Sequence, residues 1–462
     1  MKSPDPPIEH LKSILNLFNS AKLEQALEDS KILLDDYPKS VFLHNIIGAS
    51  NAALKQFDAA IDSYKMAIQI KPNHAEAYYN MAIAQKEIGA LEAAVESYKK
   101  AIEIKPDYFD SYFNMGNILR KLFDLEAAID SYKMAIQIKP NHAEAYYNMA
   151  IAQKEIGALE AAVESYKKAI ELNPDFIEAK DNLITLLTTF IPKKDASNKL
   201  VKLNEDIKSI DINTDISSII SDDQIVNFVS KSEEFITNVD IKHKTKLSQT
   251  FRRNSVNLNC SRHMSIFNEH NIIPEFCFGC YKVQVEPKSI IELIKLFIVF
   301  DQLELHENNT RKCMVELRPE VSGFYKGLIF CSGLKQANQI SDHLNIIIKQ
   351  SISPQLVSTV KRGCSEYAIA HPDYKEINNS GPQLMNYNKD WKVFEESFDR
   401  SNPTETNEIS RTSLSGLNLN DALIIQKWID YAKGMGDSSV DILKQNTVYY
   451  QEIYDQAKAR LK

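Results

Sequence analysis

The sequence predicts a multidomain protein, in which an α-solenoid is followed by an α+β domain and C-terminal helices. Two observations predict the solenoid. The segment Ala59–Glu103 is repeated letter for letter at Ala127–Glu171, and a helical repeat array is the architecture that such internal repetition indicates. Prolines also recur at intervals of 34 residues, at Pro38, Pro72, Pro106, Pro140 and Pro174. A third observation, a β-α-β-β-α-β pattern of apolar segments within residues 241–375, predicts the second domain.

Each 34-residue period contains two amphipathic helices. Helix A is expected at Ala75–Ile88 and ends at Gly89, and helix B is expected at Leu91–Ile104 and ends before Pro106, which cannot continue a helix. Small side chains stand where the two helices must approach closely, and larger ones fill the space around them. In this period they are Ala82, Ala94 and Ala101 with Tyr78, Met81 and Tyr98.

This pattern resembles the tetratricopeptide repeat (TPR) family. The resemblance covers four repeats over residues 41–176, preceded by a divergent repeat at 7–40 and followed by a lone capping helix at 176–190, so the array occupies residues 1–190. It implies a right-handed superhelix whose concave wall is made by the A helices. It also implies an interaction scaffold that binds an extended peptide or a partner protein.

Four asparagines occur at the same point of successive A helices. A carboxamide both donates and accepts hydrogen bonds, so such a ladder is suited to hold a peptide main chain. This row of asparagines is similar to the asparagine ladder in the TPR superhelices of glycosyltransferase-linked scaffolds. Alternatively, the asparagines recur only because the Tyr-Asn dipeptide is common at this position of the family's repeat. The expected peptide-binding residues are the asparagines Asn80, Asn114, Asn148 and Asn182, the neighbouring aromatics Tyr79, Phe113 and Tyr147, and the cations Lys86, Arg120 and Lys154.

The second half begins with residues 191–240, which we expect to be a helical linker. In the α+β domain, residues 241–375, strands are predicted at Tyr281–Glu286, Lys312–Leu317, Phe324–Cys331 and within Leu356–Ala370. Helices are expected after the first and third strands. This order matches a ferredoxin-like βαββαβ unit with strand order 4-1-3-2.

Residues 376–462 are expected to be a loop-rich segment followed by C-terminal helices, at about Asn418–Lys433 and Ser439–Arg460. No family resemblance is identified for residues 240–462. A reaction and its catalytic residues are therefore left unassigned, and an enzyme that the repeats recruit to a protein substrate remains an alternative to the scaffold.

The spacing of the cysteines suggests a metal site in the second half of the chain. Cys260 and His263 form C-x2-H, and Cys277 and Cys280 form C-x2-C, which suits tetrahedral zinc. The expected topology places Cys364 near Cys280 as a fifth candidate. It also suggests that Cys313 and Cys331 meet at the opposite end of the sheet. Three interpretations stay open: a structural zinc in a non-catalytic module, a reactive or redox thiol, and inert buried thiols.

Basic residues suggest a second kind of site. Arg252, Arg253 and Arg262 precede the cysteines, and Lys361 and Arg362 stand just before Cys364. If they converge on the cysteine cluster, they form an anion site. The alternative is that they are scattered surface charges.

Composition excludes several classes of protein. The net charge of −8 argues against a nucleic-acid partner. The longest apolar run, Ile290–Phe300, is interrupted by two charges, and the N-terminus has no apolar signal segment, so we expect a cytoplasmic protein without a membrane partner. Phosphate-loop, dinucleotide-binding, zinc-protease and serine-hydrolase motifs are absent from the sequence.

Overall fold

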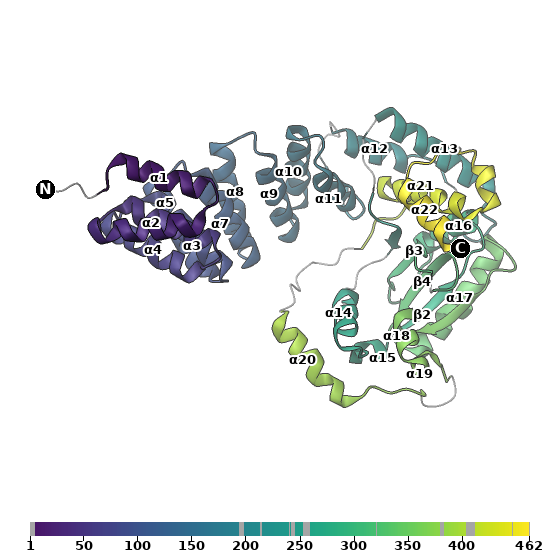
Figure 1. Ribbon diagram of the computed structural model, residues 1–462. Coiled ribbons are helices and arrows are strands. Elements are labelled where there is room, and N and C mark those ends of the chain that lie inside the picture. The colour runs from purple at the N-terminus through teal and green to yellow at the C-terminus, as the bar shows by residue number, and fades with distance from the viewer. Residues whose placement is uncertain are drawn as a thin grey trace. The chain divides into compact units, whose positions relative to one another are not determined.

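The computed structural model divides into two compact units, Met1–Ala179 and Lys180–Lys462 (Figure 1). Each is described by itself. The residues that the structure describes are 5–193, 198–212, 215–239, 241, 245–252, 259–319, 321–378, 383–402, 412–445 and 447–461. Among them, no helix has both the length and the apolar character that crossing a membrane requires.

The first unit consists of helices that pack consecutively in pairs (Figure 1). The helices expected in the second full repeat are confirmed, with α5 ending one residue early. The divergent first repeat also forms a helix pair. The helices are α1 (Ile8–Asn19), α2 (Leu23–Asp36), α3 (Val41–Ala53), α4 (Phe57–Ile70), α5 (Ala75–Glu87), α6 (Leu91–Ile104), α7 (Phe109–Lys121), α8 (Leu125–Ile138), α9 (Ala143–Glu155) and α10 (Leu159–Leu172).

One buried tyrosine of each B helix determines how closely the two helices of a full repeat approach. These four rings, in Tyr64, Tyr98, Tyr132 and Tyr166, are at most 2% exposed. In two repeats the ring lies directly against a glycine of helix A. A Cβ atom at Gly48 would lie 2.6 Å from the Tyr64 ring, and one at Gly116 would lie 2.7 Å from the Tyr132 ring. The other two repeats carry fully buried alanines at the equivalent positions, so helix A offers only small residues to the ring.

A residue with left-handed backbone turns the chain from helix A to helix B in every repeat. These residues are 34 positions apart, and their φ angles are 57° at Ala21, 61° at Lys55, 78° at Gly89, 59° at Phe123 and 84° at Gly157. The helix end expected at Gly89 is therefore confirmed. Three of the five turns nevertheless use a residue with a Cβ atom, for which this backbone conformation is unfavourable.

The second unit includes the segment that we expected to be a linker. The unit boundary falls within α11 (Ile177–Leu187), the expected capping helix. Helices α12 (Lys199–Lys208) and α13 (Asp222–Val239) follow and contact α21 (Leu419–Met435). Their buried apolar faces make them part of the unit's core rather than a connection.

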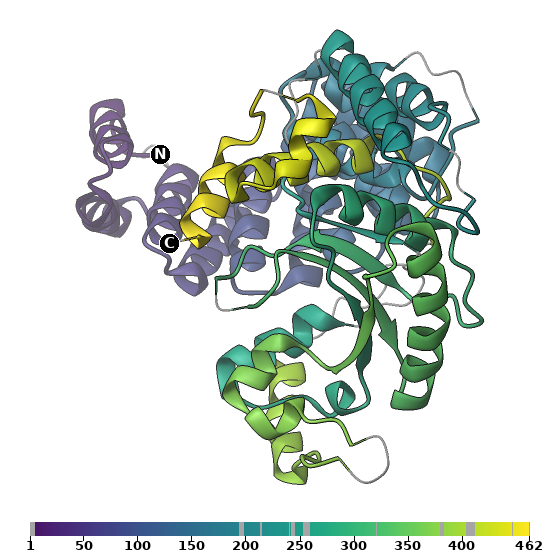
Figure 2. The same cartoon turned by 90° about the vertical axis from the view of Figure 1, so that its right-hand side faces the viewer.

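A five-stranded antiparallel sheet, in the order β1-β3-β4-β2-β5, forms the centre of the second unit. The four expected strands are present in the expected order, and β1 is an additional edge strand beside β3. Helices α16 (Ile290–Gln302) and α17 (Leu334–Ser351) pack on the sheet and on each other (Figure 2). The strands are β1 (Gln249–Arg252), β2 (Tyr281–Val285), β3 (Arg311–Val315), β4 (Tyr325–Cys331) and β5 (Ser358–Arg362).

The C-terminal helices differ in part from the prediction. Helix α21 agrees with it, whereas the second expected helix is divided into the 3-10 helix η2 (Ser438–Leu443) and α22 (Gln451–Arg460). The predicted helix is interrupted after η2 because Lys444 adopts a left-handed backbone conformation, with a φ of 55°, which cannot continue a right-handed helix. The remaining helices are short: α14 (Cys260–His270), α15 (Glu275–Phe278), α18 (Ser365–Ala370), α19 (Pro372–Lys375), η1 (Lys389–Trp391) and α20 (Lys392–Ser401).

A buried ion cluster ties the edge strand to two helices. The Arg252 guanidinium on β1 lies 2.5 Å from the Asp301 carboxylate on α16 and 2.6 Å from the Asp421 carboxylate on α21. All three side chains are at most 3% exposed. The two carboxylates also accept backbone N–H groups of Gly416 and Asn418. Each buried charge therefore has a partner, which such burial requires.

The left-handed turns lead to a stability prediction. Lys55→Gly should raise the free energy of unfolding by about 0.5–1 kcal/mol, because glycine adopts positive φ without steric cost. Gly89→Lys at the equivalent turn should lower it by a similar amount. Both positions are exposed, so little packing is altered. Urea titration followed by far-ultraviolet circular dichroism tests this, and changes of the same sign in both variants would contradict it.

The ion cluster leads to a second prediction. Arg252→Met should destabilise the second unit by about 3–5 kcal/mol, because it leaves two carboxylates buried without their cation. Lys361→Met is the matched control, since Lys361 pairs with Glu286 at the surface, where the two side chains are 43% and 45% exposed. Its loss should cost about 0–1 kcal/mol. Calorimetric unfolding of both variants checks this, and equal destabilisation would exclude the proposed role of burial.

Candidate functional site

Three of the four expected ladder asparagines lie in the first unit. Asn80, Asn114 and Asn148 are half-buried on α5, α7 and α9. Asn114 Nδ2 donates to Tyr79 Oη at 3.2 Å, and Asn148 Nδ2 donates to Asn117 Oδ1 at 3.0 Å. Among the described residues, Asn80 has no side-chain hydrogen bond, and the side-chain oxygens of the other two accept none. The side-chain oxygen of each asparagine can therefore accept a hydrogen bond from a ligand, although the Nδ2 groups of Asn114 and Asn148 already donate within the array.

The fourth asparagine, Asn182, lies on α11 beyond the boundary of the first unit. It belongs to the second unit, together with Lys180, whose Nζ donates to the backbone oxygen of Ile241 at 3.0 Å. The ladder within the first unit accordingly has three members.

The aromatic residues beside the ladder have a packing role that spacing alone did not reveal. Tyr79, Phe113 and Tyr147 are half-buried. Each ring contacts the buried tyrosine of its own repeat and a ring at the start of the next repeat. The centroid distances are 5.8 and 4.9 Å for Tyr79 with Tyr98 and Tyr108, 6.2 and 5.2 Å for Phe113 with Tyr132 and His142, and 6.1 and 4.8 Å for Tyr147 with Tyr166 and Phe176. These rings therefore join neighbouring repeats.

Two of the three expected cations of the same face lie near carboxylates. Lys86 Nζ is 2.8 Å from the carboxylate of Glu87, and an Arg120 guanidinium nitrogen is 3.5 Å from that of Glu155 in the next repeat. Lys154 is half-buried on α9. An acidic ligand would compete with Glu87 and Glu155 for the first two cations.

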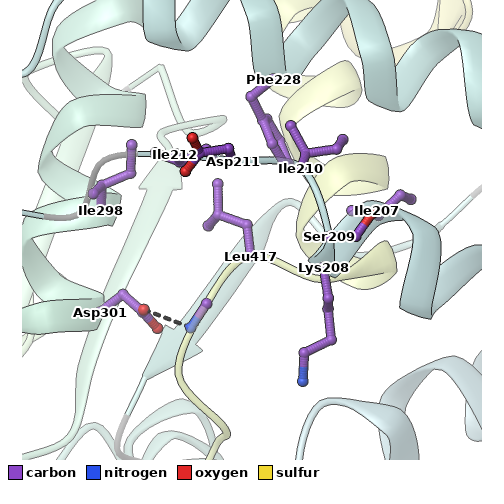
Figure 3. Close-up of a pocket in the computed structure, with 11 residues that line it drawn as sticks. Ile207, Lys208, Ser209, Ile210, Asp211, Ile212, Phe228, Ile298, Asp301 and Leu417 are labelled. Atoms are coloured by element: carbon purple, nitrogen blue, oxygen red, sulfur yellow. Dashed lines mark hydrogen bonds between the residues drawn. The ribbon is translucent and has the colours of Figure 1, made fainter.

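The second unit contains a cavity of about 330 Å³ among α12, α13, α16 and the segment before α21 (Figure 3). Burial lowers the pKa of the Lys208 amine at its edge, although the nearby carboxylates of Asp421 and Asp301 raise it. Asp301 is occupied by Arg252 and by the Gly416 N–H group. The other polar side chains that line the cavity are Ser209 and Asp211. Its apolar lining includes Ile207, Ile210, Ile212, Phe228, Ile298 and Leu417.

The candidate metal ligands do not assemble into one set. His263 stacks on Phe276 at 5.1 Å between ring centroids, and Cys277 Sγ lies 3.5 Å from Tyr367 Oη. Burial raises the pKa of the Cys277 thiol to about 12. In the described part of the chain, no three histidine, cysteine or acidic side chains are grouped so as to hold a metal ion.

Other expectations about the cysteines are met only in part. Cys364 does lie near Cys280, because Gly363 N donates to Cys280 O at 2.8 Å. Cys331, however, pairs with Tyr281 and therefore lies at the same end of the sheet as Cys280. The prediction of opposite ends was wrong, since β2 and β4 are antiparallel and the start of one meets the end of the other. Cys313 and Cys331 instead stay apart from Cys364 because they are buried on the other side of the sheet.

The basic residues expected at an anion site are occupied elsewhere. Arg252 belongs to the buried ion cluster, and Arg262 lies 2.6 Å from the Asp399 carboxylate. Arg362 donates to the Met385 backbone oxygen at 3.0 Å. Lys361 lies 3.4 Å from Glu286, and Arg253 falls outside the described residues. The four described side chains are therefore engaged with other groups and do not form the predicted anion site.

Two other lysines, which were not predicted as site residues, lie beside the cysteines. Lys282 Nζ is 3.6 Å from Cys364 Sγ, and Lys312 lies on β3 with its Nζ 5.9 Å from the Phe330 ring centroid. Both alternate with buried residues along their strands. That alternation was the available signal, whereas the predicted anion site was based on runs of adjacent basic residues.

Solved structures that resemble the chain include MamA, at 27% identity over 34% of this chain and 92% of that chain, with a TM-score of 0.33. MamA from Desulfovibrio magneticus RS-1 is 17% identical over 36% and 94% of the two chains, with a TM-score of 0.34. YrrB, described as a TPR protein with an unusual peptide-binding site, is 20% identical over 38% and 91%, with a TM-score of 0.35. Because these TM-scores lie below 0.5, the likenesses support no argument about this chain. No curated protein matches it.

Family models do match the first unit. A model described as TPR repeat matches residues 51–89, 86–122 and 116–157, and a model described as tetratricopeptide repeat matches residues 143–176. The matched residues extend from the end of α3 to the residue before α11, where the structure has paired helices at the 34-residue spacing. Residues 51–176 of this chain are tetratricopeptide repeats.

Proposed function

We propose that the repeat array is an interaction scaffold that holds an extended peptide segment of a partner protein along its A helices, α3, α5, α7 and α9. The observation that carries the proposal is the recurrence of a half-buried asparagine with a spare acceptor on three successive A helices. TPR proteins bind protein or peptide partners, and the concave wall of their superhelix is made by A helices.

The spacing supports recognition of the peptide main chain. Amide side chains at Asn80, Asn114 and Asn148 are separated by one repeat each, and a peptide alternates N–H and C=O groups along its length. Asparagine pairs with either group. Because main-chain groups are common to all peptides, this arrangement selects an extended conformation more than a particular sequence.

Hydrogen bonds within the array fix two of the ladder asparagines and leave mainly their side-chain oxygens available to a peptide. Asn114 is held by Tyr79, and Asn148 is held by Asn117. These bonds fix the two amides before a ligand arrives, which lowers the entropy cost of binding. The side-chain oxygens of both remain acceptors for peptide N–H groups, while Asn80 retains its full capacity.

For the second unit, we propose a ferredoxin-like domain extended by one edge strand. Its support is the strand order β5-β2-β4-β3, with antiparallel neighbours throughout and two helices, α16 and α17, that contact the sheet and each other. This proposal concerns architecture, and no function is inferred from it.

The peptide proposal predicts the effect of removing the ladder. Peptides selected from a random displayed library with the full chain should bind the Asn80→Ala, Asn114→Ala, Asn148→Ala variant at least about tenfold more weakly, because each lost hydrogen bond contributes about 0.5–1.5 kcal/mol. Fluorescence anisotropy with labelled peptides gives the affinities. N-methylation of the peptide backbone should weaken binding to the wild-type chain as well.

A matched control replaces two asparagines that lie in loops between repeats. Asn73 and Asn141 are exposed and occupy equivalent positions 68 residues apart. Asn73→Ala with Asn141→Ala should leave the affinity unchanged. Undiminished binding by the ladder variant, with full helical content by circular dichroism, would refute main-chain recognition by these asparagines.

A further inference from the structure

One side of the second unit's sheet is covered by helices, and the register identifies the side chains on the other. A Cβ atom at Gly327 of β4 would contact Leu296 and Phe300 of α16, so this residue faces the helices. Successive strand residues alternate between faces. Leu328 and Phe330, at odd separations from Gly327, consequently face away from α16.

The pairing of neighbouring strands then places two lysines on this second face. Lys282 of β2 pairs directly with Phe330, and Lys312 of β3 pairs with Leu328 on one side and with Phe251 of β1 on the other. Paired residues share a face of the sheet. Lys282 and Lys312 therefore project from the same face, where both are half-buried.

The two ammonium groups converge on one aromatic ring. Lys282 Nζ lies 5.5 Å and Lys312 Nζ 5.9 Å from the Phe330 ring centroid. Lys312 Nζ is also 5.6 Å from the Phe251 centroid and donates to Gln249 Oε1 at 3.1 Å. Lys282 Nζ lies 3.6 Å from Cys364 Sγ. Aromatic rings, an amide oxygen and a thiol surround the cations, and none of these groups carries a full negative charge when the thiol is protonated.

The lysines have no carboxylate partner among the described residues. Other cations of this face do have one: Lys326 lies 2.9 Å from Glu316, and Lys361 lies 3.4 Å from Glu286. Two like charges brought together in a half-buried position destabilise each other, unless an anion joins them.

The protonation of Lys312 is consistent with this arrangement. Burial lowers the pKa of its amine to about 8, and the positive charges of Lys282 and Arg318 lower it further, against the opposite influence of Cys364 and Cys260. A bound anion would favour the charged amine and raise its pKa. Anion binding and proton uptake at Lys312 should therefore be linked.

We propose that Lys282 and Lys312 form a binding site for a small oxyanion of about two negative charges, of the phosphate class, beside the thiol of Cys364. Two ammonium donors supply the charge that such an anion requires, and the flanking rings of Phe251 and Phe330 restrict the water that would compete for it. The site is independent of the peptide scaffold proposed for the first unit.

Isothermal titration calorimetry with inorganic phosphate tests the proposal on the full chain, at pH 7 and at constant ionic strength maintained with chloride. We expect one saturable site per chain. Lys282→Met and Lys312→Met should each weaken it at least about tenfold, because each removes a charged hydrogen-bond donor. Lys361→Met is the matched control: Lys361 stands directly opposite Lys282 in the sheet, but it already has a carboxylate partner and is well exposed, so its removal should change the affinity by less than about twofold.

Folding is checked separately. Removal of either lysine relieves repulsion, so both variants should melt at or above the wild-type temperature in the absence of phosphate. Should a variant fail to fold, wild-type protein labelled with ¹³C at the lysine ε-carbons gives a second measurement. Two lysine signals should shift saturably with phosphate. Absence of such shifts, wild-type affinity in the Met variants, or an equal loss in the Lys361 control would overturn the proposal.

Sulfate provides the pH test, because it keeps its two charges between about pH 6 and 9 whereas phosphate does not. The titratable groups that face Lys312 are Lys282, Cys260 and Cys364, and Arg318 stays charged throughout. Sulfate affinity should fall as the pH rises through about 8, where the Lys312 amine loses its proton. An affinity that is constant from pH 6.5 to 9 would show that Lys312 does not contribute.

Discussion

The close contact between a tyrosine ring of helix B and a small residue of helix A organises every full repeat of the first unit. The ring excludes any larger side chain at Gly48 and Gly116, so it defines both the distance between the helices and their relative rotation. Since the same contact recurs every 34 residues, the A helices repeat the same orientation. The regular placement of Asn80, Asn114 and Asn148, and with it the proposed peptide site, depends on this packing constraint.

The second unit is organised by charge pairing. Arg252 joins β1 to α16 and α21 through two carboxylates. On the sheet face that points away from α16, Glu316 pairs with both Arg318 and Lys326. These partners hold the pKa of the Glu316 carboxyl near 2, although burial alone would raise it. Against this background, the absence of described carboxylates beside Lys282 and Lys312 is the exception that motivates a ligand.

Periodicity made the first unit predictable. Glycine and proline positions located the ends of α5 and α6, and small residues located the helix contacts. The hydrogen bonds of the ladder were not predictable in the same way. Asn117, which holds Asn148, has Ile83 and Ile151 at the equivalent positions of the neighbouring repeats. A residue that departs from the repeat leaves no periodic signal.

In the second unit, four of the five strands were predictable, whereas the edge strand β1 and the residues of the site were not. Strand β1 has only four residues, too few to show clear alternation, so Arg252 was assigned to a surface site instead of the core. The cysteines were assigned by spacing, which does not report burial. Lys282 and Lys312 are 30 positions apart and become neighbours only through the pairing of β2 and β3 with β4.

Hydrogen–deuterium exchange with mass spectrometry can locate a bound peptide without altering the chain, so it tests directly whether the A helices form the peptide site. The full protein would be compared with and without a saturating library-selected peptide. We expect slower exchange in α5, α7 and α9, with little change in α6, α8 and α10. Protection confined to the B helices, or found only in residues beyond Ala179, would contradict a peptide site on the A helices.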